Sequence, residues 1–157
     1  MFIIRQAEKK DLFQIRKLLK EVGLNDRGIE EHLDHFFIAE LPGGGEGDVS
    51  QMVGIVGMEV YPPYGLIRSF VLERAPWNSK VGVHMIQVII SYAEQMGLSR
   101  IYLLAGQSTH FFTRLGFVKT GEEHLPEELH QSAHLKQSIH RGQPMVYTCE
   151  NPTSLPH

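Results

Sequence analysis

Cysteine is almost absent from this 157-residue sequence, which contains only Cys149. A single thiol cannot form an internal disulfide, and there is no cysteine cluster of the kind that binds structural zinc. The composition therefore suits a reducing compartment, and we expect a cytoplasmic protein. Long apolar runs are also missing, because charge at Arg5 interrupts the N-terminal run before it reaches the length of a signal-peptide core. No other stretch is long and apolar enough to cross a membrane, so we expect no membrane partner.

An excess of basic residues is missing too, since the formal net charge is −3. A general nucleic-acid binder needs a basic face to neutralise phosphates, so we expect no nucleic-acid partner. Hydrophobic residues make up 42% of the chain and charged residues 21%, as in an ordinary globular protein. The length supports one domain with a hydrophobic core. We expect that domain over residues 1–149, followed by a loose tail from Glu150 to His157.

Histidine is common, with nine residues, but it lacks the spacing of a metal site. The histidines of the C-terminal third are scattered, and we expect them on the surface and expect no bound metal. They are His124, His130, His134 and His140.

Hydrophobic periodicity predicts strands that alternate with helices. The expected strands are 2–6, 36–41, 51–61, 66–72, 101–105, 117–120 and 145–148, and the expected helices are 8–22, 25–33, 81–96 and 109–115, with a further helical turn at 126–131. This order predicts an α+β (mixed α/β) fold built on one mixed sheet flanked by helices.

The segment from Val53 to Thr120 resembles the GCN5-related N-acetyltransferase (GNAT) family. The resemblance is carried by a central strand over residues 65–72 that leads into the long helix, and by the strand 101–105 followed by the phrase Phe111 to Phe117. It implies the acyl-CoA N-acyltransferase fold, with a mostly antiparallel central sheet and acetyl-CoA as co-substrate. Within the family the chain is most similar to N-acetyltransferases of amino acids and of analogues such as arsinothricin. The segments that match this subgroup are 57–61, 65–69, 111–117 and 125–129.

The resemblance also places a phosphate-binding loop before the long helix. In the family this loop reads Arg/Gln-x-x-Gly-x-Gly/Ala, and here the matching stretch runs from Trp77 to Gly82 and keeps only the last glycine. Backbone N–H groups at a helix N-terminus can hold a pyrophosphate, and a lysine adds a charge contact. We therefore expect the cofactor to be bound here, the alternative being a plain helix cap at Ser79. The expected binding residues are Trp77, Asn78, Ser79, Lys80, Val81, Gly82 and Val83.

Two further cofactor contacts follow from the resemblance. Backbone N–H groups at Phe70, Val71 and Leu72 would bind the pantetheine arm and polarise the thioester if a bulge splays this strand. An apolar strand without function is the alternative. Phe112 lies where the family often has a tyrosine that protonates the leaving thiolate. We expect Phe112 to contact the cofactor, and the tyrosine acid to be missing.

Arg68 is the one cation in an otherwise apolar strand, where an unpaired charge would be costly, so it needs an anionic partner. That partner could be Glu59 on the preceding strand, in a structural ion pair, or the carboxylate of an amino-acid substrate, which a guanidinium binds in a fork. Glu59 is also the candidate general base, directly or through water. We assign both residues to the acceptor side.

The resemblance thus implies an N-acetyltransferase that moves an acetyl group from acetyl-CoA directly to the amine of a small, amino-acid-like acceptor. No serine or cysteine has a recognisable triad setting, so we expect no acyl-enzyme. One alternative is a non-catalytic module that binds acyl-CoA or a small ligand on the same fold. Another is an enzyme that uses a longer acyl chain. Members of the family often dimerise, so a homodimer is an open expectation.

Overall fold

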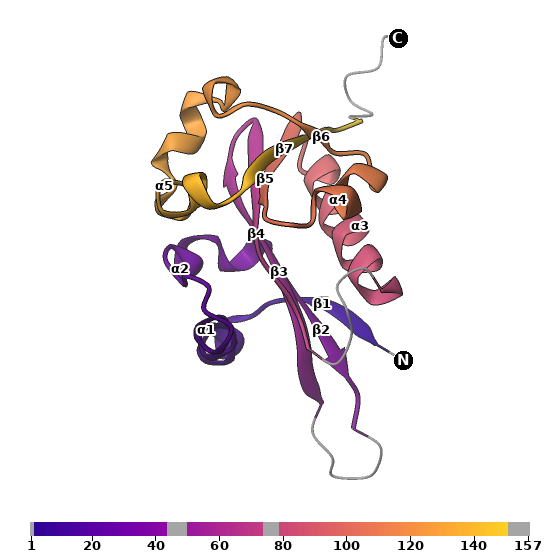
Figure 1. Cartoon of the computed structure of the whole chain (residues 1–157). Helices are drawn as coiled ribbons and strands as arrows, with labels where there is room; N and C mark the ends of the chain where they lie inside the picture. The colour runs from indigo at the N-terminus through magenta and orange to yellow at the C-terminus, as the bar shows by residue number, and fades with distance from the viewer. Residues whose placement is uncertain (1, 44–49, 74–78, 151–157) are drawn as a thin grey trace. The chain divides into compact units, whose positions relative to one another are not determined.

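The computed structural model describes residues 2–43, 50–73 and 79–150. The chain divides into two compact units, one formed by residues 1–57 and 69–89 and the other by residues 58–68 and 90–157. We call them the first unit and the second unit. Three elements pass through both units: β3 (Gln51–Tyr61), β4 (Tyr64–Leu72) and α3 (Lys80–Gln95). Figure 1 traces these elements along the chain. The expectation of a single domain stays a prediction.

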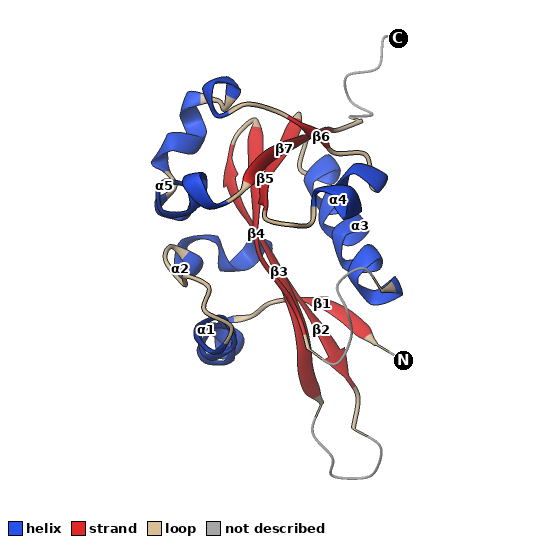
Figure 2. Cartoon of the chain, in the orientation of Figure 1, coloured by secondary structure: helices blue, strands red, loops and turns tan. Residues whose placement is uncertain are grey.

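The first unit opens with short elements and continues into the antiparallel part of the sheet (Figure 2). Strand β1 pairs antiparallel with β2, with Ile3 opposite Glu40, and β2 pairs antiparallel with β3, with Phe36 opposite Gly57. The elements that belong wholly to this unit are β1 (Ile3–Gln6), η1 (Lys9–Asp11), α1 (Leu12–Glu21), α2 (Ile29–His32), η2 (Leu33–His35) and β2 (Phe36–Leu41).

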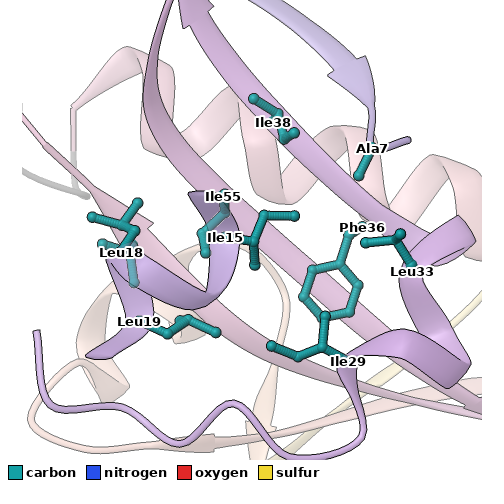
Figure 3. Packing of buried hydrophobic residues seen from close by; sticks show 10 residues of the cluster. Ala7, Ile15, Leu18, Leu19, Ile29, Leu33, Phe36, Ile38 and Ile55 are labelled. Carbon is teal, nitrogen blue, oxygen red and sulfur yellow. The ribbon is translucent and has the colours of Figure 1, made fainter. Parts of the chain in front are cut away.

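The core of the first unit lies between α1, α2 and one face of the strands (Figure 3). Helix α1 contributes Ile15, Leu18 and Leu19, whose spacing of three and four residues puts them on one side of the helix. Strands contribute Phe36, Ile38 and Ile55, which share a face because side chains alternate along a strand. The opposite face of β3 is covered by α3, since a Cβ atom at Gly54 would lie 3.3 Å from the Met85 sulfur.

The second unit contains the remaining strands and most of the short helices. Its core joins β4 and β5 to the segment after β6 through Leu66, Tyr102, Leu125, Leu129 and Leu135. On α4 and beyond it, the rings of Phe111, Phe112, Phe117 and Tyr147 form a separate chain of contacts. The elements of this unit are β5 (Arg100–Ala105), α4 (Thr109–Arg114), β6 (Val118–Lys119), η3 (Glu122–His124), η4 (Glu127–Gln131), α5 (Ala133–Ser138), η5 (Ile139–Arg141) and β7 (Gln143–Thr148).

The described strands form one sheet in the order β1-β2-β3-β4-β5-β7-β6. Strands β4 and β5 are parallel, whereas β1–β2, β2–β3, β5–β7 and β6–β7 are antiparallel. The predicted mixed, mostly antiparallel sheet with flanking helices is confirmed. Several bounds differ from the prediction: β4 begins at Tyr64 rather than residue 66, β7 begins at Gln143 rather than residue 145, and β6 is limited to Val118–Lys119. The helix expected over 8–22 is divided into η1 and α1, and the helix expected over 25–33 is limited to α2 (Ile29–His32). Helix α5 had no counterpart in the apolar pattern.

Candidate functional site

A buried ion pair lies within the second unit, between neighbouring strands. Arg68 Nη1 on β4 donates to Glu59 Oε2 on β3 at 2.7 Å, and the two side chains are 0% and 2% exposed. Side-chain alternation puts Glu59 on the same face of β3 as Tyr61, and Arg68 on the same face of β4 as Leu66. Because Tyr61 and Leu66 pack in the core of this unit, the ion pair faces the layer formed by η4 and α5.

The Glu59 carboxylate is held by more than its ion pair. The Tyr61 hydroxyl donates to Oε1 at 2.6 Å, and the Ser132 hydroxyl also hydrogen-bonds this carboxylate. Burial opposes ionisation of Glu59, but the hydrogen bonds from Ser132, Tyr61 and Arg68 outweigh it, so the pKa of Glu59 lies below its usual value. A carboxylate stabilised in its charged form accepts a proton less readily. These contacts favour Glu59 as the anionic partner that fixes Arg68 rather than as a direct base. The role of Glu59 as a general base stays a prediction.

The first turn of α5 completes the cluster. Ser132 is fully buried and caps α5, because its Oγ accepts a hydrogen bond from the Leu135 backbone N–H at 3.0 Å. His134 follows in the same turn and is half-buried. Burial and the nearby Arg68 charge lower the pKa of His134 to about 4, with Glu59 acting in the opposite direction. The imidazole is therefore neutral at neutral pH.

Sequence reasoning missed three members of this cluster: Tyr61, Ser132 and His134. The expectation of a surface position was wrong for His134, although the other three histidines of the C-terminal third are exposed. Nothing in the local apolar pattern distinguishes His134 from them, because its surroundings are set by tertiary contacts with two strands far away in sequence. A weak signal for Ser132 did exist, since serine is a preferred residue immediately before a helix.

The structure confirms an ion pair for Arg68, one of the two interpretations that its sequence context allowed. The other interpretation, binding of a substrate carboxylate, stays a prediction.

The end of β4 lies in the first unit and departs from regular strand geometry. Ser69 has a φ of 59°, a left-handed value that is rare for a residue other than glycine and typical of an interrupted strand. The Val71 side chain packs in the core of the first unit, and Leu72 packs against Gly54. Because both side chains serve packing, a ligand role for this segment would fall to its backbone, as predicted. That role stays a prediction for Phe70, Val71 and Leu72.

The pairing between β4 and β5 is short. It joins Tyr64, Gly65 and Leu66 to residues 100–102, whereas β5 continues to Ala105 in register with β7. The parallel ladder of the second unit therefore ends at Leu66, two residues before Arg68.

The start of α3 has the features of an anion site. The helix begins at Lys80, and the Val83 backbone N–H donates to the Ser79 carbonyl at 3.0 Å, which closes the first turn. The N–H groups of the residues before Val83 have no intrahelical acceptor in such a turn, including that of Gly82. Within the described part of the chain, the Ser79 Oγ is buried and has no hydrogen-bond partner. Lys80 is exposed. These donors fit a phosphate; Trp77 and Asn78, also predicted to bind, lie outside the described residues.

Phe112 is part of the aromatic contacts of the second unit. It is 6% exposed and packs edge-to-face against Phe111 and Phe117, with centroid separations of 5.0 and 5.7 Å. A ring held in this way has no group that could protonate a thiolate. Its predicted contact with the cofactor stays a prediction.

Two classes of site are not found in the described ranges. Residues 2–43, 50–73 and 79–150 hold no group of three or more histidine, cysteine, aspartate or glutamate side chains that could bind a metal ion. Nor do these ranges contain a helix with the length and apolar character needed to span a membrane.

Comparison with protein families gives a match over most of the chain. The model of the acetyltransferase (GNAT) family matches residues 4–117, which run from β1 through α4. No curated protein matches the chain.

Comparison with solved structures finds the same fold repeatedly. The N-acetylglutamate synthase from Neisseria gonorrhoeae, complexed with coenzyme A and N-acetyl-glutamate, is 23% identical with a TM-score of 0.74; the match covers 96% of this chain and 36% of the synthase chain. Rv2747 from Mycobacterium tuberculosis, in complex with CoA and a second ligand, is 20% identical with a TM-score of 0.74; the match covers 94% of this chain and 99% of the Rv2747 chain. A candidate phosphinothricin N-acetyltransferase is 14% identical with a TM-score of 0.61; the match covers 96% of this chain and 100% of the other chain.

These identities establish a shared fold. The chain spans about a third of the length of the gonococcal synthase, so the activity of that whole protein is not transferred to this chain.

Proposed function

Because the chain belongs to the acetyltransferase (GNAT) family, we propose that it transfers an acetyl group from acetyl-CoA directly to the amine of a small, amino-acid-like acceptor. The observation that carries the proposal is the family match over residues 4–117. This segment includes the buried Ser79 hydroxyl, which has no hydrogen-bond partner among the residues that the structure describes. Solved structures with this fold are complexed with CoA, and one of them also holds N-acetyl-glutamate.

We assign the pyrophosphate of acetyl-CoA to the start of α3. The backbone N–H groups from Lys80 to Gly82, which have no acceptor within the helix, and the partial positive charge of a helix N-terminus both favour an anion there. The Ser79 hydroxyl would gain the partner it lacks within the described residues, and the Lys80 ammonium would add a charge contact. Together these groups offset the loss of the first glycine of the family motif, which is Lys80 in this chain.

The transfer step needs a neutral amine and a polarised thioester. The amine nitrogen attacks the acetyl carbonyl carbon, the carbon–sulfur bond breaks, and CoA leaves as a thiolate. Backbone N–H groups near Phe70 to Leu72 would stabilise the carbonyl oxygen as it gains charge. The amine proton passes to water or to a base, and the thiolate takes a proton from solvent, since Phe112 carries no hydroxyl.

We place Arg68 and Glu59 on the acceptor side. The pair is electrically neutral and the guanidinium is fully buried, so an acceptor carboxylate would reach Arg68 only by sharing it with Glu59. An amino-acid-like acceptor, which carries both a carboxylate and an amine, suits such a site better than a simple alkylamine does.

The test is an acetyl-transfer assay with purified protein, acetyl-CoA and a panel of free amino acids, their analogues and simple alkylamines. Release of the CoA thiol and the mass of the acetylated product are measured. Turnover with an amino-acid-like amine, and none with alkylamines, is the expected result. Turnover with longer acyl-CoAs but not with acetyl-CoA would assign a different acyl group.

A non-catalytic binding module on the same fold is the second candidate. The absence of a hydroxyl at Phe112 and the stabilised anionic form of Glu59 both favour it. It predicts that acetyl-CoA binds while no amine in the panel is acetylated. A cytoplasmic location and a homodimer stay predictions.

A further inference from the structure

We propose that Ser132 is a positioning residue for acetyl transfer, because its one buried hydroxyl both caps α5 and holds Glu59 in the ion pair with Arg68. This inference rests on the proposed function and adds to it a residue that lies outside the matched family segment, residues 4–117.

The Ser132 hydroxyl has the right number of partners for both tasks. A serine hydroxyl offers one donor and two acceptor positions. The oxygen accepts from the Leu135 N–H at 3.0 Å, which leaves the hydroxyl hydrogen for the hydrogen bond to the Glu59 carboxylate. With no exposed surface, Ser132 has no water to replace either partner. The first turn of α5 is therefore tied to β3 through a single atom.

The charge balance around Glu59 explains why this bond matters. The groups that face the carboxylate are Tyr61 from β3, Arg68 from β4, and Ser132 and His134 from α5. Burial raises the pKa of a carboxyl group, and the donors must outweigh it to keep the anion. Removing one charge-assisted donor shifts this balance towards the neutral acid. Arg68 then loses its fixed anionic partner as the pH falls.

The first experiment follows Glu59 directly and needs no substrate. Carboxyl-carbon NMR titration of Glu59 is compared in wild type, Ser132→Ala and Ser132→Thr. Ser132→Ala is expected to raise the pKa of Glu59, and Ser132→Thr, which keeps a hydroxyl, is expected to restore it. Ser108→Ala is the matched control, because Ser108 precedes α4 in the same way but makes no capping hydrogen bond through its side chain.

The second experiment measures the pH profile of kcat/KM in the same variants. The acid limb is expected to move to higher pH in Ser132→Ala, with a loss of about tenfold at acidic pH, as expected for one hydrogen bond to a charged group. At alkaline pH the loss is smaller, because Glu59 is ionised in every variant. A simple loss of the helix cap would lower stability without moving this limb.

Four outcomes separate the proposals. An unchanged Glu59 titration in a folded Ser132→Ala variant overturns the inference, as does a shifted titration with an unmoved acid limb. If Ser132→Ala does not fold, the test rests on Ser132→Thr. An acid limb of kcat/KM in Ser132→Thr that lies at a different pH from that of wild type then overturns the inference. A wild-type protein that acetylates no amine contradicts the proposed function and with it the catalytic role of Ser132, whereas the Glu59 titration still reports whether the hydrogen bond holds the carboxylate.

Discussion

At the scale of single residues, the second unit buries a cation and an anion side by side on neighbouring strands. Burial of each charge costs free energy that is recovered only through good geometry and further hydrogen bonds. Glu59 accepts such hydrogen bonds from Tyr61 and Ser132, and its Oε2 lies 2.7 Å from Arg68 Nη1. The ion pair therefore depends on each of its members, and loss of one partner should cost more than loss of both.

The first prediction tests this dependence. Glu59→Gln leaves the buried Arg68 without its carboxylate and should lower the free energy of unfolding by about 3 kcal/mol. The measurement is urea denaturation followed by circular dichroism. Combining Arg68→Met with Glu59→Gln in a double variant should recover part of the loss, because no buried cation then remains. A Glu59→Gln variant as stable as wild type would show that the pair contributes nothing to folding.

His134 gives the second prediction, through the pH dependence of stability. Its pKa is about 4 in the folded chain and about 6.5 when unfolded, so the unfolded state binds more protons between these values. Stability from this residue is fully present above pH 6.5 and falls as the pH drops towards 4, by about 2 kcal/mol at pH 4.5. His134→Asn should remove this part of the slope, whereas the exposed His124→Asn should not. If the free energy of unfolding depends on pH with the same slope in wild type and in His134→Asn, the lowered pKa assigned to His134 is wrong.

Residue roles were only partly predictable from the sequence. Arg68 and Glu59 were identifiable because a charge in an apolar strand must find a partner. Ser132 and His134 were not, since their importance depends on which strand the short helix α5 covers. The position of α5 is set by Leu129 and Leu135, which pack with Leu66 in one core. These segments are about 60 residues apart in the sequence, so local periodicity does not predict the contact.

At the scale of elements, the strands with continuous apolar character were predicted most accurately. Strands β2 and β3 have the expected bounds, because loops rich in glycine and polar residues mark their shared connection. The apolar pattern predicted a strand over residues 66–72 and missed Tyr64, at which β4 begins. The interruption at Ser69 could be expected only from family resemblance, since serine carries no sequence signal for a positive φ.

The third prediction concerns the contact between β2 and β3. A Cβ atom at Gly57 would lie 2.3 Å from the ring of the fully buried Phe36, so Gly57→Ala overpacks the core of the first unit. The expected loss is about 2 kcal/mol in the free energy of unfolding. Gly106→Ala is the control, since a Cβ atom there meets nothing within 4 Å. Equal stability of the two variants, measured by thermal denaturation, would argue against this packing.

The fourth prediction concerns the start of α3. Lys80→Glu replaces an exposed cation with an anion at the proposed pyrophosphate site and should raise the KM for acetyl-CoA about tenfold, with little change in kcat. Lys17→Glu on α1 makes the same charge change at another exposed position and should leave KM unaltered. Steady-state kinetics with varied acetyl-CoA compares the two. An equal effect of both variants would indicate a general charge effect rather than a phosphate contact.

At the scale of the whole molecule, the order of elements carried more information than any single motif. The stretch predicted as a phosphate loop keeps one glycine of the family motif. The order of strand, long helix, strand and short helix nevertheless predicted the sheet, and together with the phrase Phe111 to Phe117 it indicated the family. Backbone N–H groups would explain such tolerance if the proposed pyrophosphate site is correct, because a helix N-terminus attracts an anion whatever its side chains are. The order of elements does not identify the acceptor, which we propose is recognised by the cluster around Glu59.

Isothermal titration of the wild-type protein with acetyl-CoA is the most direct measurement of the central claim, that this chain binds and uses acetyl-CoA. We predict saturable binding to one site per chain, with a dissociation constant in the range of about 1 μM to 1 mM that is typical of enzyme substrates. Binding should weaken in Lys80→Glu and remain in Lys17→Glu. Absence of heat from a folded protein at about 1 mM acetyl-CoA, together with an unchanged melting temperature, would contradict the account.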